Sequence, residues 1–183
     1  MAICDNDTLV AMLRSDETRE RGFRILIKQY GDTLYWHIRR IVVSHEDAED
    51  VMQETIINIY KNIDKFQGKS TLATWIYRIA TNEAIRLLQS HCKLFQSVDT
   101  LSESLCNSLS TENEIDEKTI KIVFQKAILQ LPLQQRLAFN MRYYDEMPYE
   151  QIAQITGKNI NTLKTNYHFA VEKIKKYIKD YSI

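Results

Sequence analysis

Apolar residues recur three and four positions apart along most of the chain, which is the spacing of one face of an α-helix. Close to the C-terminus such a stripe begins after Pro132 and includes Leu133, Leu137 and Met141. A proline suits the start of a helix, because the first turn offers no helical partner for the N–H that proline lacks. The stripe stops at residues 145–147, so one helix is predicted between these points.

Two further helices follow. Pro148 opens a short one, in which Ile152 and Ile155 mark the buried side. Gly157 then stands where the end of a helix needs a residue that tolerates positive φ, and Asn161 is a suitable N-cap for the final helix. This order predicts a helix-turn-helix, a motif whose second helix can enter the DNA major groove.

The final helix has an apolar side and a polar side. The buried stripe is predicted to contain Leu163, Tyr167, Ala170 and Ile174, and the opposite face to contain Thr162, Lys164, Thr165, Asn166 and His168. These polar side chains have the right length to contact base edges and phosphates, and they lie in the first turns, which enter the groove in such motifs. The alternative is an ordinary solvated face on a helical hairpin.

Four further apolar stripes occupy the first 95 residues, at 9–13, 23–42, 48–63 and 72–87. The chain of 183 residues has four glycines and two prolines, and this scarcity of helix-breaking residues favours helix throughout. We therefore predict an all-α protein with two small helical domains, at residues 1–95 and 118–183, the second of which is a helix-turn-helix.

Residues 96–117 separate the two predicted domains and are rich in serine, asparagine and acidic residues. This composition is typical of a flexible tether. Leu101, Leu105 and Leu109 could instead form a weak amphipathic turn. An acidic, flexible linker is the prediction.

The charge is unevenly distributed, although the formal net charge of the whole chain is zero. Residues 1–90 contain 12 Lys and Arg against 13 Asp and Glu, and residues 91–118 contain 2 against 6. Residues 119–183 contain 10 against 5, so the predicted C-terminal domain is basic. A basic domain with a helix-turn-helix favours contact with nucleic-acid phosphates.

The predicted third helix of the N-terminal domain has an acidic face. Asp47, Asp50, Gln53 and Glu54 are three or four residues apart and therefore share one side of the helix. A simpler interpretation is a solvated helix start, capped by Ser44, whose acids complement the helix dipole.

The predicted fourth helix has a face of mixed chemistry. It is formed by Tyr77, Arg78, Thr81, Asn82 and Arg86, with Trp75 close by. Aromatic, amide and guanidinium groups together fit stacking on unpaired bases and hydrogen bonding to them. Alternatively, the two aromatic rings belong to the core and the arginines only serve solubility.

Other classes of function find little support in the sequence. The three cysteines form no C-x-x-C pair, and His91-Cys92 has no further metal ligand at a suitable spacing. A glycine-rich phosphate loop and a G-x-S-x-G nucleophile elbow are both missing. No apolar run approaches the roughly 20 residues of a membrane span, and the N-terminus does not look like a signal peptide. We expect a cytoplasmic protein without metal or cofactor that is not an enzyme.

Two groups of motifs carry a resemblance to a known family. Residues 47–55 (DAEDVMQET) and 66–84 (FQGKSTLATWIYRIATNEA) resemble region 2 of bacterial sigma factors, within the extracytoplasmic-function (ECF) group of the sigma-70 family. Region 4 of that family is resembled by Leu131-Pro132, Arg136, Arg142, residues 149–153 (YEQIA) and residues 161–165 (NTLKT). The match covers about residues 5–90 and 118–180, in the order of the family.

The resemblance implies a partner for each face. The core-polymerase-binding residues, which would dock on the β′ clamp helices, are Asp47, Asp50, Gln53 and Glu54. The residues that would hold the melted −10 element are Phe66, Lys69, Ser70, Tyr77, Arg78, Asn82 and Arg86. The residues that would read the −35 duplex are Lys158, Asn161, Thr162, Lys164, Thr165, Asn166 and His168. Arg136 and Arg142 would contact phosphates or stabilise the domain. The family also implies contact with the polymerase β flap and control by an anti-sigma factor.

This chain departs from the family pattern at two places. Relatives often have Ser-Arg after the lysine of the last helix, where this chain has Thr165-Asn166. An acid often stands at the position of Arg86, and basic residues stand where Gln89 and Ser90 are. The −35 preference and the contacts at one end of the −10 face therefore need not follow those of relatives.

Three alternatives remain open. The chain could be a conventional helix-turn-helix regulator that binds its operator as a dimer, although this leaves the region 2-like motif unexplained. It could be an enzyme with an active site assembled from distant residues. It could also be a truncated sigma factor that binds polymerase as a decoy without supporting transcription.

Overall fold

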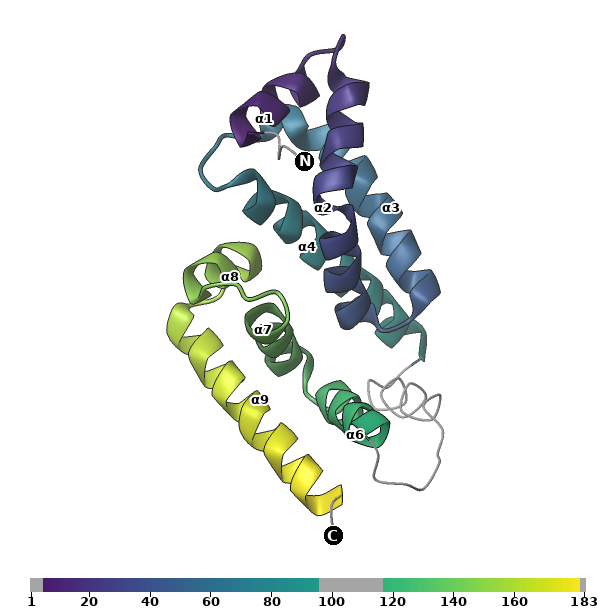
Figure 1. Cartoon of the computed structure of the whole chain (residues 1–183), viewed down its shortest axis with the longest axis vertical. Coiled ribbons are helices and arrows are strands. Elements are labelled where there is room, and N and C mark those ends of the chain that lie inside the picture. Colours follow the sequence, from purple (N-terminus) through teal and green to yellow (C-terminus); the bar gives the residue numbers. More distant parts are fainter. Residues whose placement is uncertain (1–4, 96–116, 182–183) are drawn as a thin grey trace. The chain divides into compact units, whose positions relative to one another are not determined.

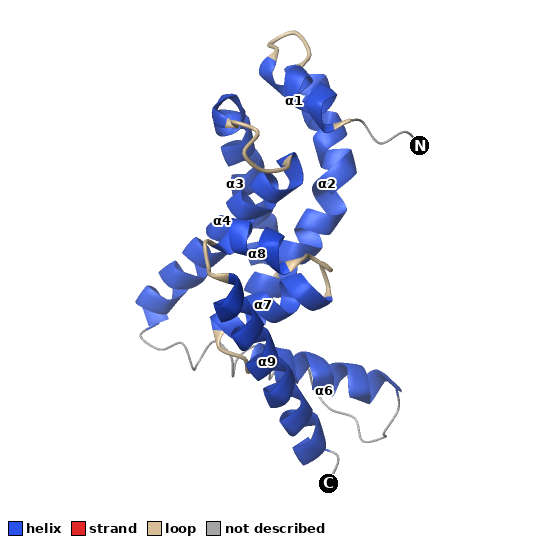
Figure 2. Cartoon of the chain, turned by 90° about the vertical axis from the view of Figure 1, so that its left-hand side faces the viewer, coloured by secondary structure: helices blue, strands red, loops and turns tan. Residues whose placement is uncertain are grey.

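The structure is a computed structural model of the chain, and it describes residues 5–95 and 117–181. Side chains are described for residues 5–91 and 121–181. These parts consist of helices joined by turns and loops, and no strand occurs within them (Figure 2). The chain divides into two compact units, and each is considered separately.

The N-terminal unit is built from four α-helices and a short 3-10 turn (Figure 1). These are α1 (Asn6–Arg14), α2 (Arg19–Val42), α3 (His45–Asn62), η1 (Ile63–Lys65) and α4 (Leu72–Phe95). Helix α2 packs against both α1 and α3. The core between the helices is apolar, and Leu9, Ile38, Ile59 and Ile76 are completely buried in it.

The starts of α3 and α4 follow from local sequence, whereas the end of α2 does not. Val43 ends α2 with a positive φ of 69°. Ser44 caps α3, because its hydroxyl accepts a hydrogen bond from the Asp47 N–H at 3.4 Å, as the sequence predicts. Thr71 does the same for α4, accepting from the Thr74 N–H at 3.2 Å. These caps fix where the polar faces of α3 and α4 begin.

The C-terminal helices are α6 (Glu117–Leu129), α7 (Leu133–Tyr143), α8 (Tyr149–Thr156) and α9 (Ile160–Tyr181). Helix α9 packs along α6 and α7. Its buried residues include Leu163, Ala170 and Ile174, in agreement with the predicted stripe. Phe139 of α7 stacks on the Tyr167 ring of α9 at a centroid distance of 5.8 Å. Aromatic packing therefore holds the two helices together.

The turns of the helix-turn-helix are largely those predicted. Pro132 precedes α7, and Gly157 follows α8 with a φ of 67°. The N-cap of α9 was predicted wrongly, because the helix begins at Ile160 and the cap is Asn159. The Asn159 side-chain oxygen accepts from the Asn161 N–H at 2.8 Å, so Asn161 lies inside the first turn.

The prediction of an all-α protein of two helical units with a C-terminal helix-turn-helix is confirmed. The exact domain limits at residues 95 and 118 stay predictions. Apart from residue 117, the predicted linker lies outside the described residues.

Candidate docking and nucleic-acid interfaces

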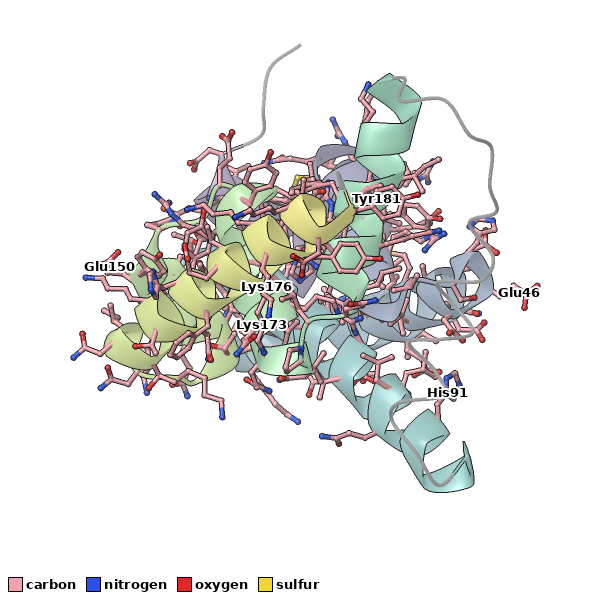
Figure 3. All side chains as sticks on the ribbon, turned by 90° about the horizontal axis from the view of Figure 1, so that it is seen from below. Glu46, His91, Glu150, Lys173, Lys176 and Tyr181 are labelled. Carbon is pink, nitrogen blue, oxygen red and sulfur yellow. The ribbon has the colours of Figure 1, made fainter. Side chains whose placement is uncertain are left out.

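The acidic face of α3 points to solvent. Asp50, Gln53 and Glu54 are exposed, and Asp47 is half-buried beside its cap. Glu46 also projects away from the start of the helix (Figure 3). The opposite side of α3 holds the buried residues Ala48, Val51, Thr55 and Ile59. All four predicted core-binding residues therefore come together on one accessible stripe.

The turn before α4 is held at its first residue, Phe66, by two contacts. The Phe66 ring packs against the Trp75 ring at 5.4 Å, and the Arg14 guanidinium donates a hydrogen bond to the Phe66 carbonyl oxygen. Between these anchors and the helix, Lys69 is exposed and Ser70 is half-buried. The turn thus presents a cation and a hydroxyl from a fixed backbone.

Helix α4 presents an exposed stripe of donors. Arg78, Asn82 and Arg86 follow one another at intervals of four residues, and all three are exposed. Arg86 forms an ion pair with Glu83, and Glu83 also accepts from the Asn58 side chain of α3 at 2.9 Å. The first two members of the stripe can reach a ligand directly, whereas Arg86 is already engaged.

Tyr77 lies elsewhere than the sequence suggested. Its exposed fraction is 9%, and its ring meets the ring of His37 edge to face at 4.9 Å. Trp75 and Thr81 of the same helix are buried as well. The rings of Trp75 and Tyr77 therefore belong to the core, which is the alternative considered for this helix above. Because the ring of Tyr77 is enclosed, it offers no open plane for a base, and the stacking role expected of it is corrected.

The N-terminal turns of α9 display the polar side chains expected for a recognition helix. Lys158 in the preceding turn and six helical residues form this face. Of these six, Asn161, Thr162, Lys164, Thr165 and His168 are exposed, and Asn166 is half-buried. They lie opposite the buried stripe of α9. The arrangement offers amides, hydroxyls, an imidazole and two ammonium groups on one side of the helix and the turn before it.

A cluster around Tyr149 was not foreseen. Its ring lies under the Arg142 guanidinium at 5.5 Å and under the Lys164 ammonium at 5.8 Å, and it meets the Tyr167 ring at 6.4 Å. Burial raises the pKa of the Tyr149 hydroxyl, while nearby Arg142 lowers that pKa and Tyr167 raises it. Tyr149 thus joins α7 and α8 to the side chain of a predicted DNA contact on α9. Its contacts span two turns, so helical spacing gave no signal for them.

Arg142 holds the helix-turn-helix together, and Arg136 is partly buried within it. Arg142 donates to the Met147 carbonyl oxygen at 3.0 Å and so braces the turn between α7 and α8. Arg136 is half-buried on α7, and burial lowers its pKa. Of the two roles considered for these arginines, the contacts of Arg142 match stabilisation of the domain.

Neither a metal centre nor a membrane span is found in the described segments. Across residues 5–95 and 117–181 no group of three or more potential metal ligands comes together. Within the same ranges, every helix is either too short or too polar to cross a bilayer.

Together these features define an all-helical protein with a C-terminal helix-turn-helix and an exposed acidic stripe on α3. The family model for sigma-70 region 2 matches residues 26–93, and the model for sigma-70 region 4 matches residues 121–174. The ECF RNA polymerase sigma factor SigW of Bacillus subtilis is 28% identical over 168 residues, covering 87% of this chain and 90% of SigW. The ECF RNA polymerase sigma-E factor of Escherichia coli is 31% identical over 175 residues, covering 90% and 91%.

Solved structures share the fold. The sigma factor RpoE from Bartonella quintana, in complex with the anti-sigma factor NepR, has a TM-score of 0.67 at 22% identity, covering 87% of this chain and 98% of RpoE. CnrH, in complex with the cytosolic domain of CnrY, has a TM-score of 0.69 at 16% identity, covering 96% and 97%. The chain belongs to the ECF group of the sigma-70 family. It is a sigma factor, and it directs RNA polymerase in the initiation of transcription.

Proposed function

We propose that this sigma factor works through three separate surfaces: the acidic stripe of α3, the turn and outer stripe of α4, and the N-terminal face of α9. The observation that carries the proposal is that each surface is accessible and is fixed by a cap or anchor at its root. The first surface is acidic, whereas the other two offer hydrogen-bond donors and cations.

Asp47, Asp50, Gln53 and Glu54 are proposed to dock on the β′ clamp helices of core RNA polymerase. Their support is the exposed stripe on α3 and the resemblance of residues 47–55 to the family's motif. An exposed ion pair contributes less than about 1 kcal/mol, so removing one carboxylate would have little effect. Charge reversal is a stronger perturbation, because it turns attraction into repulsion.

The experiment is co-purification of the Asp50→Arg, Glu54→Arg double variant with core polymerase. We expect core binding to be lost while the helical circular dichroism spectrum is unchanged. The control is Glu17→Arg with Asp32→Arg, which makes the same change of charge at two other exposed positions of the N-terminal unit. Equal recovery of polymerase by both double variants would refute the clamp assignment.

The turn before α4 and its outer stripe are proposed to hold the non-template strand of the −10 element. Lys69, Ser70, Arg78 and Asn82 supply hydrogen-bond donors, and the Phe66 ring is the half-buried aromatic group at the edge of this face. Unpaired bases need both stacking planes and edge contacts. Tyr77 is proposed to support the helix rather than to touch DNA, and Arg86 to act only after its pair with Glu83 opens.

The α9 face is proposed to read the −35 duplex, from Lys158 to His168. Two modest DNA sites on one polymerase gain affinity through effective concentration, so the isolated chain should bind promoter DNA weakly. Run-off transcription with core polymerase and a genomic fragment library would test this. We expect start sites that appear only when the chain is added, and tight promoter binding only by the holoenzyme.

The same experiment separates the alternatives. Core binding without transcripts would favour a decoy, and tight binding to an operator without polymerase would favour a conventional regulator. The proposed mechanism involves no catalysis by this chain, and its site of action would be the bacterial cytoplasm, where the polymerase works. The region 4-like part is further proposed to contact the β flap. RpoE was solved with an anti-sigma factor, and an anti-sigma partner is proposed for this chain too.

A further inference from the structure

An exposed phenylalanine interrupts the polar side of α9. Phe169 has half of its surface exposed. It follows Thr162, Thr165 and Asn166 at seven, four and three residues, so it continues their stripe along the helix. Burying an apolar side chain away from water is favourable in free energy. A partner surface that covers Phe169 would therefore gain binding free energy.

Phe169 is within reach of the groove in which the proposed −35 contacts lie. A rise of 1.5 Å per residue separates it from Thr162 by roughly 10.5 Å along the axis. The DNA major groove is about 12 Å wide and admits an α-helix. A helix that lies along the groove can therefore present Thr162 and Phe169, which are about two turns apart, to base edges together. The ring of the neighbouring His168, which is also exposed, lies 5.9 Å from the Phe169 ring.

The chemistry of the stripe indicates which base Phe169 would meet. Arginine and lysine are the residues that most often read guanine. Helix α9 contains no arginine over Ile160–Tyr181, so Lys164 is the one proposed contact on this helix that belongs to that class. Asparagine pairs with adenine, whereas threonine methyl groups and phenylalanine contact the C5-methyl group of thymine. Asn166, Thr165 and Phe169 thus form a set suited to A·T pairs.

We propose that Phe169 is a specificity-determining residue that packs against the methyl group of a thymine in the −35 duplex. The inference rests on the proposed placement of α9 in that groove. Burying one methyl group is worth about a factor of four in an equilibrium constant. Phe169 therefore selects thymine over cytosine, which has no methyl group, at one position of the element.

The test removes the methyl group from the DNA and the ring from the protein. Each thymine of the −35 element in a promoter found by run-off transcription is replaced singly by deoxyuridine, and holoenzyme binding is measured. Deoxyuridine should lower the affinity of the wild-type holoenzyme about fourfold at one position. On unmodified DNA, Phe169→Ala should bind more weakly than the wild type by a similar factor. Deoxyuridine at that one position should not lower the affinity of Phe169→Ala further.

Tyr181→Ala is the matched control. Tyr181 is an aromatic residue of the same helix with 56% of its surface exposed, and it lies at the opposite end of α9 from the proposed contacts (Figure 3). This variant should keep the wild-type response to every deoxyuridine. Circular dichroism should show unchanged helix content in both variants, since both side chains are exposed.

Salt dependence distinguishes the methyl contact from an ionic one. Phe169→Ala should leave the slope of log affinity against log salt unchanged, whereas Lys164→Ala should reduce it by about one if Lys164 meets a phosphate. The inference is overturned, and the proposed function stands, if the wild-type holoenzyme binds the promoter but no deoxyuridine substitution lowers its affinity. The same holds if Phe169→Ala loses as much affinity as the wild type on the deoxyuridine-containing DNA. If no promoter is bound at all, both fail.

Discussion

Replacing Tyr149 by leucine tests whether the ring under Arg142 and Lys164 prepares α9 for DNA. The substitution keeps an apolar side chain at the start of α8 but removes the aromatic plane. Tyr149→Phe is the matched control, because it keeps the ring and loses only the hydroxyl. Arg142 retains its hydrogen bond to the Met147 carbonyl oxygen in either variant. The ammonium of Lys164 would lose its contact with the ring.

The geometry sets the size of the effect. Both cations lie within 6 Å of the ring centroid, at 5.5 and 5.8 Å. At partly exposed sites each such contact is worth about 0.5–1 kcal/mol, so Tyr149→Leu should destabilise the C-terminal helices by about 1–2 kcal/mol. For a unit of this size the midpoint of thermal unfolding should fall by about 4–16 °C. Freeing one long side chain should also weaken promoter binding by roughly two- to tenfold.

The assay uses two probes of unfolding on the full chain. Both tryptophans of the sequence, Trp36 and Trp75, lie in N-terminal helices, so their fluorescence follows that unit, whereas far-UV circular dichroism follows both. Tyr149→Leu should lower the midpoint seen by circular dichroism and leave the fluorescence transition in place, and Tyr149→Phe should change neither. If Tyr149→Leu bound promoter DNA in the holoenzyme as tightly as wild type, the positioning of Lys164 by the ring would be disproved.

Chemical denaturation can test two further features of the backbone. Gly157→Ala should destabilise the protein by about 1–2 kcal/mol, because φ is 67° there and a Cβ in that conformation is strained even in open space. Gly31→Ala should stabilise it by about 0.5–1 kcal/mol, because that glycine is helical and a Cβ would make an ordinary 3.5 Å contact with Ile27; the same sign for both variants would contradict the argument. Asn159→Ala should cost about 0.5–2 kcal/mol as a lost N-cap, whereas Asn161→Ala should cost less. A larger loss at Asn161 would restore it as the cap.

Features that depend on the local chain could be predicted from the sequence. Pro132 and Gly157 mark the helix ends because proline and glycine restrict or free φ wherever they stand. Ser44 could be identified as a cap because its bond partner is three residues away. The cap of α9 was misplaced because Asn159 and Asn161 are chemically the same. Only the three-dimensional path of the turn decides which of them precedes the helix.

How many adjacent residues of α4 are buried could not be predicted from periodicity. Trp75, Ile76 and Tyr77 are consecutive and all buried, whereas an amphipathic pattern assumes a single stripe. The contact of Tyr149 with Lys164 joins residues 15 positions apart across two turns. Contacts of that kind depend on how helices pack. Phe169 did carry a signal, since an apolar residue in the polar stripe of α9 is visible on a helical projection.

A buried polar contact links the core of the N-terminal unit to its proposed DNA face. The Thr81 hydroxyl donates its proton to the Tyr77 carbonyl oxygen at 2.7 Å, so its oxygen accepts from Nε2 of His37 on α2 at 3.0 Å. A buried polar group that loses its partner costs about 1–3 kcal/mol. Rotating α4 about its axis would break this bond, and the bond therefore favours one rotation. That rotation is the one in which Arg78 and Asn82 face solvent, so the partners inside the core determine which side chains remain available to DNA.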